Sequence, residues 1–167
     1  GLSSIMAKKK KKKGPDGNIV AQNRKARHDY YIEKTFEAGI MLLGSEVKSL
    51  RRGSSSLVDC YAQETDGELF LLNAYIPEYA PSAKHTGHED PRRQRKLLLH
   101  KREIERLKMS ISRDGYSLVA LSIYFNDRGM AKVELGLGKG KSKGDKRQTS
   151  KDRDWKRDKA RMMSHKN

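Results

Sequence analysis

Positive charge is concentrated at the two ends of this chain, and this distribution limits where a folded core can lie. Residues 1–29 carry nine Lys and Arg against two Asp, and residues 138–167 carry twelve against four. Residues 30–137 carry 16 Lys and Arg against 15 Asp and Glu, so the middle of the chain is nearly neutral. Hydrophobic residues make up only 35% of the chain, below the ~45–50% that is usual for a globular domain. We therefore expect one core-forming domain with two cationic arms.

The overall charge also limits the kinds of partner that this protein is expected to bind. A formal net charge of +16 favours a polyanion over a small-molecule substrate, because each phosphate that is neutralised releases a counterion. The single cysteine, Cys60, excludes an internal disulfide and fits a reducing compartment. No apolar run approaches the ~18 residues of a membrane span, and the basic N-terminal stretch lacks the apolar segment of a signal peptide. We expect a cytoplasmic protein, with residues 1–5 a tag or an upstream extension before a natural start at Met6.

Alternating hydrophobic residues predict short antiparallel strands in the middle of the chain. Residues 28–36 have the aromatic and β-branched composition of a strand, and turn residues at 65–67 and 126–129 each join two further strands in a hairpin. In the second hairpin, the alternation places four side chains on one face of each strand. These sets are Val119, Leu121, Ile123 and Phe125 on the first strand, and Ala131, Val133, Leu135 and Leu137 on the second.

Two stretches have helical patterns. "SEVKSLRRG" predicts a short helix that Ser45 caps and Gly53 ends, and "HKREIERLKMSI" places Ile104, Leu107 and Ile111 on one helical face. Five or six strands with about three helices suit a mainly β fold, best a small antiparallel barrel of the oligonucleotide-binding type. We expect this domain to span residues 19–137.

The two arms have different compositions. Residues 1–18 are low in complexity and are expected to be disordered. The glycine-rich start of residues 138–167 indicates a flexible linker, whereas residues 151–163 contain neither Gly nor Pro. Thirteen residues make a marginal helix in water, so we expect this part to become helical only against a partner. Trp155, the only tryptophan, would then serve that contact rather than a core.

No catalytic constellation is present in the sequence. Residues 140–142, "GKS", resemble the end of a phosphate-binding loop, but Leu135 stands where that loop needs a glycine. His85 and His88 share a predicted loop without the further ligands that a zinc site needs. Cys60 lies in a predicted strand and is expected to be a small core residue. The sequence therefore indicates a binding protein that is not an enzyme, without metal or cofactor.

Three basic clusters point to nucleic acid as the ligand, with RNA favoured. They lie at residues 23–28, 48–52 and 92–102, and in the last of them three leucines stand between Lys96 and His100, beside phosphate donors. A charged face that is merely solvated is the plain alternative. Two further alternatives stay open: a constitutive ribosomal protein, and a nucleic-acid-processing enzyme.

Several long motifs, in order, resemble one bacterial family. "NRKARHDYYIEKTFEAGIMLLGSEVKSLRRG", "RKLLLHKREI" and "GKGKSKGDKR…DWKRDKARMM" are similar to the SsrA-binding protein (small protein B, SmpB) family, over about residues 18–163. The resemblance implies an oligonucleotide-binding-like barrel that binds the tRNA-like domain of transfer-messenger RNA and brings it to stalled ribosomes. It also implies elongation factor Tu with GTP as a delivery partner, tagging of the nascent chain, no membrane, and a monomer.

The resemblance also assigns roles to individual positions. It assigns RNA contact on the barrel to Asn23, Arg24, Lys25, Glu37, Glu46, Lys48, Arg51, Arg95, Lys96, Leu98 and His100. It assigns contact with small-subunit ribosomal RNA, at the decoding centre and message channel, to Asp145, Lys146, Arg147, Trp155, Lys156, Lys159, Met162 and Met163. This chain departs from the family pattern at Gly144, where members often have His or Tyr, so a stacking ring is absent there.

Overall fold

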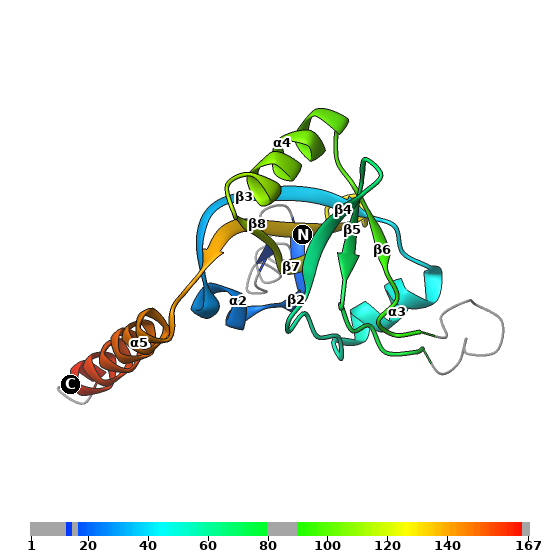
Figure 1. The fold of residues 1–167 in the computed structure, drawn as a ribbon. Helices are drawn as coiled ribbons and strands as arrows, with labels where there is room; N and C mark the ends of the chain where they lie inside the picture. The colour runs from blue at the N-terminus through cyan, green and yellow to red at the C-terminus, as the bar shows by residue number, and fades with distance from the viewer. Residues whose placement is uncertain (1–12, 15–16, 80–89, 165–167) are drawn as a thin grey trace.

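A computed structural model describes residues 13–14, 17–79 and 90–164, and the body of the protein is a ring of antiparallel strands (Figure 1). The strands are β1 (Lys13–Gly14), β2 (Gly17–Gln22), β3 (Tyr30–Ile40), β4 (Tyr61–Thr65), β5 (Glu68–Leu72), β6 (Arg95–Leu98), β7 (Ser117–Asn126) and β8 (Ala131–Gly140). Along the ring the strands follow the order β7–β4–β5–β6–β3–β8, and the ring closes where β8 pairs with β7. Strand β2 also pairs with β7 but lies outside this ring. The mainly β barrel predicted from the sequence is confirmed.

Four helices lie within the described residues, and three of them flank the barrel (Figure 1). They are α2 (Arg24–Asp29), α3 (Gly44–Arg52), α4 (Lys101–Ser112) and α5 (Lys143–Ser164). In α4, Ile104 and Leu107 are buried in the main core and Ile111 packs against it, as the sequence predicted. The fourth helix, α5, projects from the barrel.

Both predicted hairpins are present, and their turn residues explain them. Asp66 (φ 53°) and Gly67 (φ 82°) join β4 to β5 in the left-handed conformation that a two-residue hairpin turn requires. Between β7 and β8, the Asn126 side-chain oxygen accepts hydrogen bonds from the N–H groups of Arg128, at 3.0 Å, and Met130, at 2.9 Å. These local hydrogen bonds fix the loop length and hence the pairing of the two long strands.

The prediction that one face of β7 carries all four apolar residues is wrong. The register between β7 and β8 shifts between Ala120 and Ser122, which reverses the side-chain alternation at that point. Val119 and Leu121 therefore pack outside the barrel against Ala26 of α2, whereas Ile123 and Phe125 belong to the main core. On β8 the prediction holds, because all four apolar residues contact the main core.

The start of α3 differs from the prediction in its capping residue. Leu43 is the N-cap and Ser45 lies buried inside the first turn, so Ser45 does not cap the helix. The longer Glu46 side chain reaches back instead, and its Oε1 accepts the Leu43 N–H at 2.8 Å. Gly53 ends the helix in the left-handed conformation (φ 83°), as predicted.

Order begins earlier in the chain than the sequence suggested. β2 starts at Gly17, which pairs with Asn126 of β7, so ordered structure extends past the predicted boundary at residue 18. The rest of the predicted N-terminal arm, residues 1–12 and 15–16, lies outside the described residues.

The strand predicted over residues 28–36 is β3, which starts later than predicted, at Tyr30, because α2 occupies the preceding residues.

The barrel also extends further at its C-terminal end, because Gly138 and Gly140 belong to β8. Gly138 pairs with Ile32 of β3 on one side and with Ser117 of β7 on the other. A Cβ at position 138 would lie 2.1 Å from the Tyr31 carbonyl oxygen, far inside van der Waals contact. Close approach of the strands, rather than flexibility, therefore accounts for glycine at this position.

Residues 143–164 form one continuous helix, α5, where the sequence predicted a flexible segment that becomes helical against a partner. The body itself supplies contacts for its first half and for the residues just before it. The Lys141 backbone N–H donates to the Asp29 carbonyl at 2.7 Å, His28 Nε2 lies 2.8 Å from Ser150 Oγ, and Lys146 Nζ lies 3.6 Å from an Asp29 carboxylate oxygen. The second half, from residue 151 to residue 161, is exposed.

We predict that Gly138→Ala lowers the free energy of unfolding by about 3 kcal/mol, because the added methyl group forces β3 away from β8. Gly144→Ala is the matched control: its added Cβ meets only Ser142 Oγ, at 3.9 Å, and a helical Gly→Ala change is stabilising by up to about 1 kcal/mol. Urea unfolding of both variants measures the difference. Equal stability of the two would contradict the close-packing explanation for Gly138.

Candidate nucleic-acid interface

A buried ion-pair cluster joins α3 to β6. Glu46 and Arg95 are both fully buried, and Arg95 Nε donates to Glu46 Oε2 at 2.6 Å. Arg93 donates to the same carboxylate, from Nε to Oε2 at 3.1 Å and from a terminal nitrogen to Oε1. The other nitrogens of Arg95 donate to the carbonyl oxygens of Ala74 at 2.8 Å and Pro91 at 3.0 Å. The cluster thus fixes α3 against β6 and two adjoining segments.

This burial gives Glu46 and Arg95 a structural role, and their predicted RNA contacts stay a prediction. With no exposed side-chain surface, neither residue can touch a ligand on the surface of this structure. Charged groups are almost never fully buried unless they are paired, and here each neutralises the other. Their role in the structure is to position the exposed side of α3. Arg93, which belongs to the basic cluster predicted at residues 92–102, completes the buried ion-pair cluster.

Asn23 is also mainly a structural residue. It is 5% exposed, its Oδ1 accepts the Ala26 N–H at 3.2 Å, and its Nδ2 donates to the Ala120 carbonyl at 3.0 Å. Its amide thereby caps α2 and ties it to β7. In this structure Asn23 positions the cations that follow it, and its predicted RNA contact stays a prediction.

Those cations lie on α2, where Arg24, Lys25 and Arg27 are exposed. Lys25 lies 3.7 Å from an Asp59 carboxylate oxygen, and Arg27 lies 3.4 Å from Glu134 on β8. A groove of about 650 Å³ between α2 and α5 brings four arginines together with a single acidic side chain. Its charged lining residues are Arg24, Arg27, Glu134, Arg153 and Arg157. No pattern in the sequence predicted that α5 would meet α2 here, where Arg27 of the basic cluster at residues 23–28 lies.

Glu37 and Leu98 lie on the same outer face of the barrel. Glu37 is on β3, accepts a hydrogen bond from the Tyr124 hydroxyl at 2.5 Å and lies 4.0 Å from Lys132 Nζ. Leu98 on β6 pairs with Gly39, two residues after Glu37, and is 48% exposed. A Cβ at position 39 would lie 3.2 Å from Leu98 Cβ, so the glycine leaves room for this side chain.

Lys96 continues that face along β6. Its Nζ donates to Glu68 on β5 at 3.0 Å, and it stands two residues from Leu98, so both side chains point outward. His100 is the exposed N-cap residue of α4, at the end of the same segment. The structure therefore brings together the predicted residues of β3 and β6.

The outer side of α3 is a second cationic surface. Lys48, Arg51 and Arg52 are exposed there. The Arg51 guanidinium lies over the Phe125 ring at 4.2 Å, and Arg52 lies over the Tyr79 ring at 4.5 Å. Cation–π contacts hold the two side chains against the body while their remaining donors face solvent. These cations lie on the same helix as the buried Glu46.

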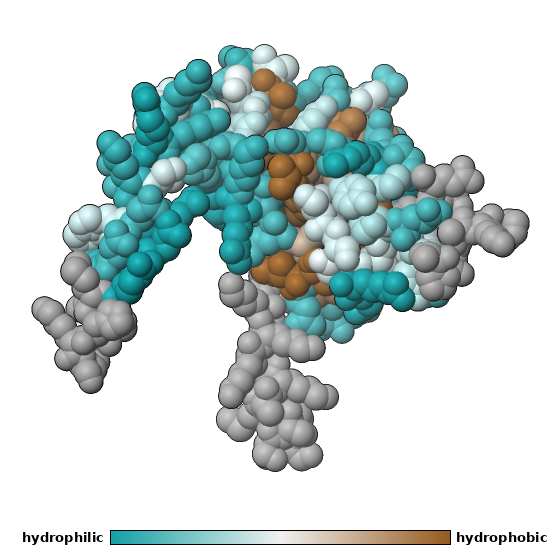
Figure 2. Space-filling view, turned by 90° about the horizontal axis from the view of Figure 1, so that it is seen from below, coloured by the Kyte–Doolittle hydropathy of each residue, from teal (hydrophilic) through white to brown (hydrophobic). Residues whose placement is uncertain are grey.

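The tail residues stay apart from the barrel face. Trp155 is 62% exposed, and Lys159 Nζ lies 5.1 Å from its ring centroid. Lys156 and Arg147 are exposed, whereas Lys146 is half-buried against Asp29. Figure 2 shows the described part of α5 as an almost wholly hydrophilic limb that stands away from the body. Met162 and Met163 lie in the helix, but their side chains fall outside the described residues.

Cys60 is a buried core residue. Burial raises the pKa of the Cys60 thiol to about 12, with the charge of Arg95 acting weakly against it, so the thiol is an inert core group.

His85 and His88 lie outside the described residues. Among the residues that are described, no group of His, Cys, Asp and Glu is arranged to hold a metal ion. No helix in this part of the chain is long and apolar enough to span a membrane.

A closed small β-barrel that exposes cations on the helices that flank it, and further cations on a projecting helix, defines a polyanion-binding protein of the small β-barrel class. The family model described as "SmpB protein" matches residues 20–165. The chain belongs to this family.

Curated relatives and a solved structure agree with this membership. The chain is 56% identical to the SsrA-binding protein of Rhodospirillum rubrum over 147 residues, 88% of this chain and 91% of the relative. It is 55% identical to that of Parvibaculum lavamentivorans over 166 residues, 99% of each. A chain of the structure described as "tmRNA-SmpB: a journey to the center of the bacterial ribosome" superposes with a TM-score of 0.60 at 52% identity, covering 73% of this chain and 84% of that one.

We predict that Glu46→Gln lowers the free energy of unfolding by about 3–5 kcal/mol, because it leaves the buried Arg95 charge without a counter-charge. Glu68→Gln removes the half-exposed partner of Lys96 and should cost at most about 1 kcal/mol. Guanidinium unfolding of both variants gives the comparison. Similar small losses in both would show that the buried cluster does not hold α3.

The same cluster predicts a loss of stability in acid. Burial alone raises the pKa of Glu46, but hydrogen bonds from Arg93 and the Leu43 N–H, with the charge of Arg95, outweigh it and hold the pKa below its ordinary value of 4.5. A carboxylate with a lowered folded-state pKa stabilises fully above the unfolded-state value, and this stabilisation is lost as the pH falls through the folded-state value. Thermal melting of the wild type should therefore decline more steeply below about pH 5 than melting of Glu46→Gln. If the melting temperatures of the two proteins fall in parallel as the pH is lowered, the stabilising role of the ionised Glu46 is contradicted.

Proposed function

We propose that this protein binds the tRNA-like domain of transfer-messenger RNA and brings it to stalled ribosomes, so that the nascent chain is tagged and the ribosome is released. Relatives that match nearly the whole chain are described as SsrA-binding proteins, and the related solved chain belongs to a tmRNA–SmpB ribosome structure. The observation that carries the proposal is the position of the cations. They are exposed on α2, α3 and α5, while the three predicted contacts that are buried, Asn23, Glu46 and Arg95, hold the scaffold.

The barrel is the part that binds transfer-messenger RNA in this proposal. Arg24 and Lys25 on α2, and Lys48 and Arg51 on α3, present donors to phosphates from fixed positions. Leu98 offers an exposed apolar contact beside Lys96, which suits RNA with unpaired bases. Such binding should weaken steeply as salt is added.

The tail is the part that engages the ribosome. Asp145, Lys146 and Arg147 lie in the first turns of α5 and would meet the decoding centre, and the segment from Trp155 onward would occupy the empty message channel. Trp155, exposed on a helix with cations around it, can stack on a base while Lys156 and Lys159 reach phosphates. A message in the channel would exclude the tail, which gives a physical basis for sensing its absence.

The remaining partners belong to the same proposal. Elongation factor Tu with GTP delivers the alanyl-charged complex, the protein acts as a monomer in the cytoplasm, and small-subunit ribosomal RNA is the main ribosomal contact. The cationic helix α5 supports the last point, because its exposed second half carries Lys and Arg on most sides.

We predict that removing residues 143–167 leaves the affinity for the tRNA-like domain within about threefold of the wild type but abolishes tagging on stalled ribosomes. The cut follows the last strand, so the barrel keeps β8 intact to Gly140. Gel-shift titration and an in vitro tagging assay are the measurements.

A matched control for the truncation is the full chain with Arg113→Ala, an exposed cation at the end of α4 outside the proposed contacts. It should bind and tag as the wild type does. If the truncated protein loses RNA binding and tagging together, the division of labour between barrel and tail is wrong.

A further inference from the structure

A cavity opens in the barrel wall where β4 meets β7, and among the cations proposed to contact RNA only Lys25 lines it. The two strands pair only at Tyr61 and Val119, with one further hydrogen bond from the Ala120 N–H to the Cys60 carbonyl at 3.4 Å. Toward α4 a pocket of about 570 Å³ lies between the strands. We name it the seam pocket. Its volume lies in the range of sites that hold small organic ligands.

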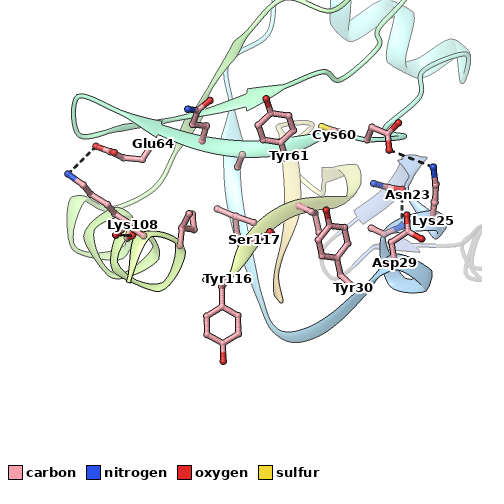
Figure 3. Close-up of a pocket in the computed structure, with 18 residues that line it drawn as sticks. Asn23, Lys25, Asp29, Tyr30, Cys60, Tyr61, Glu64, Lys108, Tyr116 and Ser117 are labelled. Carbon is pink, nitrogen blue, oxygen red and sulfur yellow. Dashed lines mark hydrogen bonds and ion pairs between the residues drawn. The ribbon is translucent and has the colours of Figure 1, made fainter. Parts of the chain in front are cut away.

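The interior of the seam pocket is apolar and its mouth carries aromatic rings. Ala62, Leu118 and Ile111 contribute apolar side chains to its lining. Tyr61, which is 44% exposed, and the half-buried Tyr30 stand on opposite sides of it, from β4 and β3 (Figure 3). An exposed tyrosine ring beside an apolar cavity is the arrangement that proteins use to stack a planar group.

The charged residues at the two ends of the pocket limit the kind of ligand that it can hold. Lys25 and Asp59 lie 3.7 Å apart at the α2 end, and Lys108 and Glu64 lie 3.7 Å apart at the α4 end (Figure 3). With Asp29, the lining has one more carboxylate than it has lysines. A phosphate inside is therefore disfavoured, whereas an uncharged planar ligand with N–H donors is compatible with this lining.

A nucleobase of an RNA is a ligand of that kind, and the phosphates of the same RNA can stay outside the pocket. Exposed Arg24 follows Asn23, which lines the α2 end of the pocket, so a backbone that follows α2 passes the mouth. We propose that the seam pocket receives one unpaired nucleobase of the bound RNA, stacked on Tyr61. This proposal rests on the proposed RNA-binding function and adds to it a site of base contact on the opposite side of α2 from the arginine-lined groove.

The first test is the affinity for the fluorescently labelled tRNA-like domain of transfer-messenger RNA, measured by anisotropy. Tyr61→Leu should weaken binding by about tenfold, since loss of one base–aromatic stack has an effect of this order. Tyr31→Leu is the matched control: Tyr31 is a strand tyrosine of similar exposure, 51%, outside the pocket lining, and its change should leave affinity within about twofold. Thermal melting of both variants checks that the barrel is intact.

The second test does not depend on Tyr61. Ser117 lies at the centre of the pocket (Figure 3), so Ser117→Phe should fill it and weaken binding as Tyr61→Leu does. In the wild type, millimolar AMP, GMP, CMP or UMP should shift the amide NMR signals of Gln63, Ser117 and Val119. Unchanged affinity in both pocket variants, or nucleotide shifts only elsewhere, overturns the base site and leaves an apolar side chain of a protein partner as its occupant. Failure of the wild type itself to bind the RNA would instead overturn the proposed function.

Discussion

The buried pair between Glu46 and Arg95 is the interaction on which the arrangement of the binding surface depends. It links a short helix to a strand, and Arg95 also holds the carbonyl oxygens of Ala74 and Pro91. A helix of nine residues has little stability of its own, so its orientation must come from such contacts. The exposed cations of α3 are therefore presented in fixed positions because the opposite side of the helix is anchored by charge. Replacing either partner alone leaves the other uncompensated in the interior.

A second constraint separates the rigid barrel from the projecting helix. Gly138 lets β8 run between β3 and β7 without a clash, so the barrel stays closed up to the point where the chain leaves it. Polar contacts from His28 and Asp29 to Ser150 and Lys146 then hold the first half of α5, while the second half carries its tryptophan into solvent. The structure thus has one cationic surface fixed on the barrel and another that extends away from it.

The sequence predicts the barrel well because short-range signals define its parts. Alternation along β8, the turn at Asp66 and Gly67, and the helical stop at Gly53 all act within a few residues, and each is found in the structure. The failures have longer-range causes. The shift at Ala120 depends on pairing with a distant strand, and only the folded structure shows that Glu46 meets Arg95, 49 residues later. A matched family motif identified these residues as important, but burial decides whether a charge contacts a ligand or the interior.

The emission of Trp155, the only tryptophan, tests the division between barrel and tail most directly. It should be recorded for the free protein, then with the tRNA-like domain of transfer-messenger RNA, then with stalled ribosomes. Because Trp155 is 62% exposed on the far half of α5, the account predicts a water-like spectrum in the first two states and a blue shift only with ribosomes. A spectrum already shifted in the free protein, or shifted by the RNA domain alone, would contradict the claim that the barrel binds the RNA while the tail remains available for the ribosome.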